Sequence, residues 1–243
     1  MVTSMKIIAV ASAKGGVGKS TFCCGIAGHL VNKKKRILLI DADIGVRSLD
    51  ILLGVSEKTV YNWGDVIVGN CEYRKAVTEV RNELFLLPAP INFSDSYTTE
   101  SFGKMIEALK NDFDYVILDA PAGLESGFVL ASSVADECII ISTPEPTSIR
   151  AASYACERVK KNTNAEVRLV INKFNKVLHK KIDIDEVIDT VSARLLGIIP
   201  DSREIYASVN GKKLPADCKG NKALRRIADR IDGENIPLRI KEL

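Results

Sequence analysis

The segment from Ala13 to Thr21 constrains this chain more than any other, because it reads AKGGVGKST between an apolar stretch and a helical pattern. The apolar stretch runs from Lys6 to Ala11, so the order is strand, glycine-rich loop and helix, which is typical of a phosphate-binding loop. Glycines let the backbone turn its N–H groups onto a phosphate, and the helix N-terminus adds a partial positive charge. A simple glycine turn does not explain the Lys-Ser-Thr that follows. The sequence therefore predicts a nucleotide-binding protein.

Individual positions of this loop have expected roles. Lys19 is expected to reach the outer phosphates, and Ser20 to hold Mg²⁺ through its hydroxyl group. The generic pattern has glycine at the position of Ala13, a departure that we treat as minor. The loop residues predicted to bind the nucleotide are Ala13, Lys14, Gly15, Gly16, Val17, Gly18, Lys19, Ser20 and Thr21.

Short apolar runs alternate with helical patterns along the rest of the chain. Almost unbroken runs of this kind fit strands that are buried on both faces of a parallel sheet. The 243 residues are 46% hydrophobic and suffice for one large domain, here residues 1–243. We predict an α/β fold with a doubly wound, mostly parallel sheet flanked by helices, and a ligand at the carboxyl ends of the strands. The runs are Ile37–Ile40, Leu84–Leu87, Tyr115–Leu118, Cys138–Ile141, Val167–Ile171 and Leu195–Ile199, and helical patterns include Phe102–Leu109, Ile149–Val159 and Ala223–Ile231.

Acidic residues follow two of these apolar runs. Asp41 and Asp43 come after the run that ends at Ile40, and Asp119 comes directly after Leu118. Hydrolysis of a nucleoside triphosphate requires a group that orients water and a cation that neutralises the developing charge. We predict that Asp43 orients the water and that Asp119, at the Walker B position, supports Mg²⁺. Ser20, Asp43 and Asp119 are the predicted metal-site residues, with helix capping or turn solvation as the alternative for Asp41 and Asp43.

Asn172 follows the apolar run that ends at Ile171. Its amide carries both a donor and an acceptor, as recognition of the exocyclic amine and ring nitrogen of adenine requires. We therefore predict that Asn172 contacts the base of ATP. An asparagine at a strand end is also an ordinary turn residue, so that interpretation stays open.

The second lysine of the loop, Lys14, has no packing role, because loop side chains there point toward solvent or ligand. With it, the run KGGVGKST resembles the deviant Walker A ATPases of the MinD/ParA family. The resemblance implies that Lys14 crosses the interface of an ATP-sandwich homodimer, that Asp43 lies in the first switch segment, and that Pro200 lies near the base. The expected catalytic residues are then Lys14, Lys19 and Asp43. An exposed loop lysine is the alternative for Lys14.

Flanking segments resemble the MinD branch of this family. ParA proteins usually continue the D-x-D pair with P-Q-G, which this chain lacks, and iron–sulfur carriers need cysteines, which are absent from Asp119 to Phe128. Ser48 stands where MinD relatives usually have asparagine. The segments that carry the resemblance are Asp43–Asp50, Asp119–Gly123, Pro144–Arg150 and Ala223–Ala228.

The resemblance implies an ATPase (ATP and water to ADP and phosphate) that depends on ATP and Mg²⁺ and acts in septum-site placement during cell division. Its ATP homodimer is expected to meet a protein activator or effector. The alternatives are a ParA-like partition module that binds nonspecific DNA as an ATP dimer, and an FlhG-like regulator of flagellar number. ATP-dependent, salt-sensitive DNA binding separates the partition module from the other two.

The net charge and the last residues of the chain indicate whether the protein binds a membrane or nucleic acid. A net charge of +3 creates no strong general attraction to DNA or anionic lipid, and the basic cluster Lys33–Arg36 is typical of a solvated turn. Relatives that cycle on membranes end in a basic amphipathic helix, whereas Glu234–Leu243 is short and interrupted by Pro237. We expect a cytoplasmic protein, with peripheral attachment at the inner face of the cell membrane as the alternative and DNA as the less favoured partner.

Overall fold

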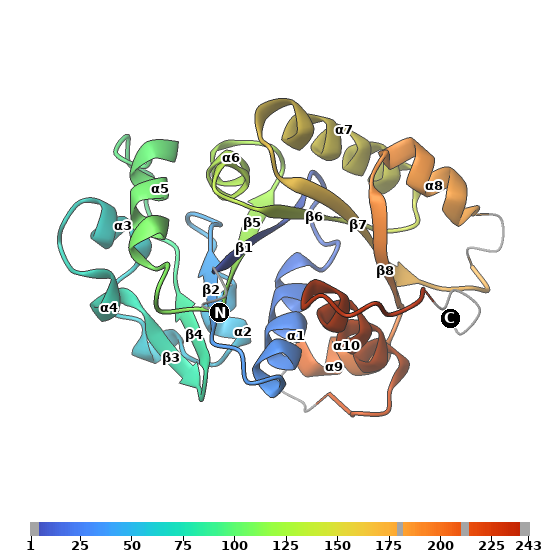
Figure 1. Ribbon diagram of the computed structural model, residues 1–243, viewed down its shortest axis with the longest axis horizontal. Helices are drawn as coiled ribbons and strands as arrows, with labels where there is room; N and C mark the ends of the chain where they lie inside the picture. The colour runs from blue at the N-terminus through green and yellow to red at the C-terminus, as the bar shows by residue number, and fades with distance from the viewer. Residues whose placement is uncertain (1–4, 179–181, 210–213, 239–243) are drawn as a thin grey trace.

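The computed structural model describes residues 5–178, 182–209 and 214–238. Within them, eight strands form one sheet in the order β3-β4-β2-β5-β1-β6-β7-β8, and β3 is antiparallel to β4 while the other neighbours run parallel (Figure 1). This confirms the predicted fold class, and each predicted apolar run lies in a strand. The strands are β1 (Lys6–Ser12), β2 (Ile37–Asp41), β3 (Thr78–Arg81), β4 (Leu84–Leu87), β5 (Tyr115–Ala122), β6 (Glu137–Ser142), β7 (Glu166–Phe174) and β8 (Arg194–Pro200).

Helices cover both faces of the sheet (Figure 1). One face carries α5, α6, α7 and α8, and the opposite face carries α1, α9 and α10. The longer helices are α1 (Lys19–Asn32), α5 (Thr99–Ala108), α6 (Ser126–Ser133), α7 (Pro146–Asn162), α8 (Ile184–Val191), α9 (Arg203–Val209) and α10 (Lys219–Ile231). Shorter ones are α2 (Leu49–Leu52), η1 (Ser56–Lys58), α3 (Trp63–Ile67) and α4 (Tyr73–Ala76). No helix among the described residues combines the length and apolar character needed to cross a membrane.

Strand β2 shows why the apolar runs are unbroken. Successive side chains of a strand point to opposite faces. Leu38 and Ile40 accordingly join the core cluster on the α5–α8 side, whereas Ile37 and Leu39 join the one on the α1 and α10 side. All four residues are fully buried. A strand that is covered on both faces has no solvent-facing positions, so its sequence lacks the alternating polar residues of a half-exposed strand.

The structure differs from the sequence-based prediction at helix starts and at one sheet edge. Helix α5 begins three residues before the predicted pattern, because Thr98 and Ser101 form a capping box that closes its first turn. Strand β3 was not predicted. Its four residues are alternately half-buried and exposed, as suits an antiparallel edge strand, and they give no apolar run.

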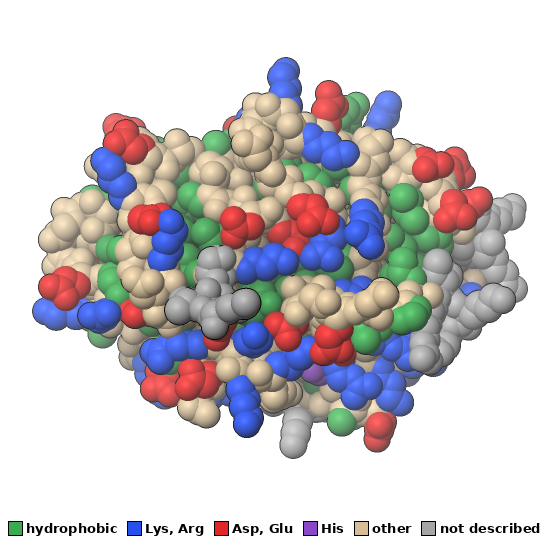
Figure 2. Space-filling model, in the orientation of Figure 1, with side chains coloured by type: hydrophobic (Ala, Val, Ile, Leu, Met, Phe, Trp, Pro, Cys, Tyr) green, Lys and Arg blue, Asp and Glu red, His purple; other side chains and the backbone are tan. Residues whose placement is uncertain are grey.

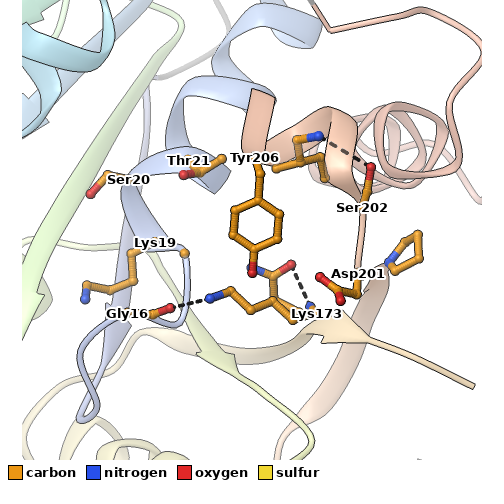
Figure 3. A pocket seen from close by; sticks show the side chains of 12 residues that line it. Gly16, Lys19, Ser20, Thr21, Lys173, Asp201, Ser202 and Tyr206 are labelled. Carbon is orange, nitrogen blue, oxygen red and sulfur yellow. Dashed lines mark hydrogen bonds between the residues drawn. The ribbon is translucent and has the colours of Figure 1, made fainter. Parts of the chain in front are cut away.

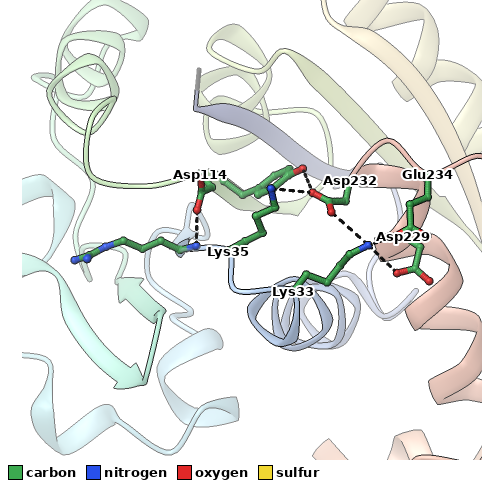
Figure 4. Close-up of polar contacts among 8 residues, drawn as sticks. Lys33, Lys35, Asp114, Asp229, Asp232 and Glu234 are labelled. Atoms are coloured by element: carbon green, nitrogen blue, oxygen red, sulfur yellow. Dashed lines mark hydrogen bonds and ion pairs between the residues drawn. The ribbon is translucent and has the colours of Figure 1, made fainter. Parts of the chain in front are cut away.

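The basic cluster Lys33–Arg36 lies in the turn between α1 and β2 and faces the end of α10 (Figure 4). The Lys33 amine lies 3.1 Å from Asp229 Oδ1 and 3.3 Å from Asp232 Oδ2, and it also pairs with Glu234. Lys35 lies 3.5 Å from Asp232 Oδ1. These contacts join two segments that are far apart in sequence, and they neutralise charge that the sequence alone displays as a basic run. On the face seen in Figure 2, basic and acidic side chains are likewise interspersed.

Candidate nucleotide-binding site

The loop between β1 and α1 has the backbone conformation that its glycines predict. Gly16 and Gly18 have φ angles of 73° and 96°, in the left-handed region that favours glycine, and Gly18 is the N-cap of α1. A Cβ atom on Gly18 would lie 2.5 Å from Asn172 Nδ2. Both conformation and space therefore require glycine at this position. Lys19, the first residue of α1, is buried despite its charge.

Two buried carboxylates lie side by side at the carboxyl edge of the sheet. Asp41 at the end of β2 is in register with Asp119 on β5, and each is at most 1% exposed. Burial raises the pKa of Asp119 to about 7; the Ser20 hydroxyl opposes this by hydrogen bonding, and the nearby Asp41 adds to it. Burial also raises the pKa of Asp41 to about 6. Two buried carboxylates so close together favour a nearby cation.

The donors around Asp119 suit Mg²⁺. Among the described residues, Asp119 Oδ1 is buried and has no hydrogen-bond partner. Ser20, the second residue of α1, lowers the pKa of the same carboxyl group by hydrogen bonding, and Ser20 Oγ lies 3.5 Å from Ser48 Oγ. Hydroxyl and carboxylate oxygens are the ligands that Mg²⁺ prefers, and an unpaired buried oxygen is the kind of group that a cation or its bound water satisfies. The residues present therefore fit the ion.

Asp43 and Lys19 complete this cluster. Asp43 is half-buried, and burial raises the pKa of its carboxyl group while the Lys19 ammonium lowers it. The effect of Lys19 on this pKa indicates that the Asp43 carboxylate lies within electrostatic reach of the loop lysine. The fold thus brings together four of the residues predicted from sequence, namely Lys19, Ser20, Asp43 and Asp119.

Asp41 is committed to the backbone of the segment that follows β2. Its carboxylate accepts hydrogen bonds from Asp43 N at 2.9 Å and from Leu49 N, at the start of α2, at 3.0 Å. The Trp63 indole donates to the Asp41 carbonyl oxygen at 2.8 Å. This matches the capping alternative for Asp41, which holds Asp43 and Ser48 near the phosphate loop.

A cavity of about 350 Å³ opens beside the loop (Figure 3). Asn172 and Pro200 line it together with five loop and helix residues, so the predicted base and phosphate contacts share one cavity. The Asn172 amide donates to the Val17 carbonyl at 2.7 Å and accepts from Lys173 N at 2.9 Å. One amide hydrogen and one lone pair remain for a ligand. The loop and helix residues of the lining are Gly16, Gly18, Lys19, Ser20 and Thr21.

Four predicted residues of the loop lie outside the cavity lining. Val17 is buried in the core, and Ala13 and Gly15 lie earlier in the turn. Lys14 points elsewhere, since its amine lies 3.3 Å from Thr147 Oγ1 near the start of α7. Within one chain, Lys14 therefore does not join Lys19 and the acids.

Sequence reasoning missed several residues that the fold places in the cavity. Lys173 has a φ angle of 57° and donates from its amine to the Gly16 carbonyl at 2.7 Å, so it closes the loop from the end of β7. Asp201, Ser202 and Tyr206, which follow β8, form another part of the lining. Only their position after a predicted strand end signals them in the sequence, because the contacts span more than 150 residues.

A parallel sheet whose first strand leads through such a loop into a helix, with acids at the ends of neighbouring strands, defines a P-loop nucleotide-binding protein. Residues 5–184 match a family model described as an AAA domain. By this match and the relatives below, the chain belongs to the MinD/ParA family of P-loop ATPases and is a MinD-like member of it.

The relatives match nearly the whole chain. The septum site-determining protein MinD of Bacillus subtilis is 37% identical over 246 residues, covering 97% of this chain and 92% of the relative. The MinD protein of a Synechocystis strain is 36% identical over 242 residues, covering 96% and 91%. A structure of the MinC:MinD cell division protein complex of Aquifex aeolicus superposes with a TM-score of 0.88 at 33% identity, covering 96% of this chain and 98% of that one.

Proposed function

We propose that this chain is a Mg-ATP-dependent ATPase that switches between a monomer and an ATP-sandwich homodimer in the placement of the division septum. The observation that carries the proposal is the convergence of Lys19, Ser20 and Asp43 on a buried carboxylate, Asp119, with an unpartnered oxygen. The septum site-determining relatives support the cellular role, because they match almost the full length of this chain.

In this proposal each group has one task. Lys19 and the N–H groups at the start of α1 bind the phosphates, and Asn172 and Pro200 lie at the base. Asp43 orients a water molecule for attack on the γ-phosphorus, so that a P–O bond forms to water while the bridging bond to ADP breaks. Ser20 and Asp119 would hold Mg²⁺, which would supply positive charge to neutralise the phosphates. Asp41 keeps Asp43 in place through the hydrogen bond to its backbone.

The dimer part of the proposal rests on Lys14. Among the described residues, the hydrogen-bond partner found for its amine is Thr147, at an exposed site. A lysine placed this way is available to a partner's nucleotide once ATP brings two chains together. The Aquifex relative was solved in complex with MinC, and we propose that the ATP dimer here also offers a surface to a protein activator or effector. The protein would act in the cytoplasm or at the inner face of the membrane.

Light scattering of purified protein with and without Mg-ATP tests the switch. We expect Asp43→Ala to bind ATP and to accumulate as a dimer without turnover. Lys19→Ala should bind no nucleotide and stay monomeric, and Lys14→Ala should bind ATP without forming a productive dimer. Equal ATP turnover in wild type and Asp43→Ala would remove the proposed role of that carboxylate, and an unaltered, fully active dimer of Lys14→Ala would remove the cross-interface role.

Sedimentation of the trapped Asp43→Ala dimer separates the alternatives for its partner. The dimer is spun with anionic liposomes in one arm and with nonspecific duplex DNA in another, at two salt concentrations. ATP-dependent sedimentation with DNA that weakens in salt would favour the ParA-like alternative and overturn the septum proposal. Sedimentation with liposomes would place the protein at the membrane, and a dimer that ignores both would act through proteins alone.

A further inference from the structure

The nucleotide cavity has two chemically different ends. At one end the lining is formed by Gly16, Gly18 and the first residues of α1, which include Lys19. At the other end, the lining includes Pro200, the last residue of β8. Asp201, which follows β8, and Tyr206 on α9 continue it (Figure 3). The proposed function assigns the phosphates to the first end and leaves Tyr206 without a task.

The Tyr206 ring lies across this cavity rather than in the core (Figure 3). The residue is 51% exposed, whereas its neighbour Ile205 packs against the α1 and α10 core cluster. The Lys173 amine lies 5.6 Å from the centroid of the ring and also donates to the Gly16 carbonyl. Lys173 thus holds one face of the ring beside the phosphate loop by a cation–π contact.

A half-exposed aromatic ring contributes little to packing, because about half of its area stays in water. A planar ring at the border of a polar cavity is, in contrast, suited to stack on a planar ligand group, as aromatic side chains do on nucleobases. Stacking depends on the area and polarisability of the rings and only weakly on hydrogen-bond pattern. A purine gains more from such a contact than a pyrimidine does.

We propose that Tyr206 stacks on the base of the bound nucleotide and makes the site prefer purines to pyrimidines. This inference rests on the proposed function, because it assumes that the phosphates bind at the loop. In this proposal, Tyr206 and Asn172 recognise different features of the base. Tyr206 senses ring size, whereas Asn172, with one amide hydrogen and one lone pair left, senses the edge that distinguishes adenine from guanine.

Calorimetric titration of Tyr206→Ala, Tyr206→Leu and Tyr206→Phe with Mg²⁺ and ADP, GDP, CDP, UDP or pyrophosphate tests the proposal. Tyr154→Ala is the matched control, since Tyr154 is 55% exposed on α7 and does not line this cavity. We expect Tyr206→Ala and Tyr206→Leu to weaken ADP and GDP binding by about 10-fold, CDP and UDP binding by less, and pyrophosphate binding not at all. Tyr206→Phe and the control should bind like wild type.

Three outcomes would overturn the inference, and they differ from failure of the proposed function. Wild-type affinity for ADP in both Tyr206→Ala and Tyr206→Leu would show that the ring does not contact the base. An equal loss of pyrophosphate affinity would show a disturbed phosphate loop. A loss in Tyr206→Phe as large as in Tyr206→Ala would assign the effect to the hydroxyl group. If wild type bound no nucleotide, the proposed function itself would fail, and with it the premise of the inference.

Discussion

Buried carboxylates lie at both ends of the central sheet, but in the described part of the chain they are paired with cationic side chains at one end only. At the amino ends of the strands, Glu137 is 1% exposed, and its carboxylate lies 2.8 Å from the Lys6 amine and 2.7 Å from Arg168 Nε. At the carboxyl ends, Asp41 and Asp119 are as deeply buried, yet no cation pairs with Asp119 Oδ1 among the described residues. The paired charge at one end joins neighbouring strands, whereas the free oxygen of Asp119 at the other end is available to the cation of the proposed function. Burial alone therefore does not distinguish a structural acid from one that binds a ligand. The groups that pair with the acid make this distinction.

The largest expected effect is at the paired end. Glu137→Gln removes the anion between Arg168 and Lys6 and leaves a mostly buried guanidinium group with only the exposed Glu166 nearby among the described acids. We expect the free energy of unfolding to fall by about 3–5 kcal/mol, measured by urea denaturation at pH 7. Glu166→Gln is the matched control, because that carboxylate is 59% exposed and 3.9 Å from the same arginine. Its loss should be about 0.5 kcal/mol or less. Similar losses in both variants would contradict the buried role of Glu137.

The same kind of substitution at the unpaired end should have the opposite sign. Asp119→Asn removes a buried charge, one oxygen of which has no hydrogen-bond partner among the described residues. We expect the metal-free variant to be more stable than wild type by a few kcal/mol, at most about 4, at pH 8. With Mg-ATP the order should reverse, because the wild type alone retains the carboxylate for the ion. Urea denaturation in a chelator, and then in Mg-ATP, measures both.

The pH dependence of this difference follows from the raised pKa of Asp119, about 7 in the folded chain against an ordinary value of 3.8 for an aspartate. Between these values the folded state binds more protons than the unfolded state, so its stability falls as pH rises. The advantage of Asp119→Asn should therefore be full above pH 7 and disappear as pH falls toward 4. An advantage that is independent of pH would show that a change in packing, and not the charge, is responsible.

Asp41 differs from Asp119, although both lie at the carboxyl end of the sheet, because the Asp41 carboxylate accepts backbone hydrogen bonds. Asp41→Asn keeps the size of the side chain and replaces one acceptor oxygen by an amino group that cannot accept from the backbone N–H of Asp43 or Leu49. Relief of the buried charge offsets part of this loss, so global stability should change by about 1 kcal/mol or less. Amide hydrogen exchange at Leu49 should become about 10-fold faster. Unchanged exchange there would show that Asp41 does not brace this segment.

What the sequence predicted well was determined locally. The phosphate loop needs particular residue types at fixed spacing, since Gly16 and Gly18 occupy left-handed conformations and Lys19 begins the helix. The buried strands were equally visible, because β2 and β5 are covered on both faces and carry continuous apolar runs. Asn172 was predicted from its amide chemistry and its place after an apolar run, and Pro200 from the family resemblance; the fold brings both to the same cavity.

What the sequence did not show depends on contacts between distant residues. Lys173 and Tyr206 reach the cavity only because β7 and β8 end beside the loop, and neither residue has a local pattern that marks it. Glu137 reads as an ordinary charged residue until Lys6 and Arg168 are brought to it across neighbouring strands. The contact from Lys14 to Thr147 likewise spans 133 residues. Propensity and periodicity carry no information about such pairs.

The smallest effect is expected at the surface, where the turn after α1 pairs with the end of α10. Lys33 contacts three acids, but its side chain is 23% exposed, so water and salt screen the attraction. Lys33→Met should lower the free energy of unfolding by about 1 kcal/mol or less at low salt. The exposed neighbour Lys34 is the control, and Lys34→Met should have no measurable effect.

Urea denaturation in 1 M NaCl tests whether salt screens the contacts of Lys33. The Debye length is then about 3 Å, so the loss in Lys33→Met should shrink toward that of Lys34→Met. The effect of Glu137→Gln should persist in the same salt, because the Glu137 carboxylate is shielded from ions by the sheet. A Lys33 effect of several kcal/mol that resists salt would mean that this contact behaves like the buried pair. Burial would then no longer predict which ion pairs contribute strongly to the free energy of unfolding.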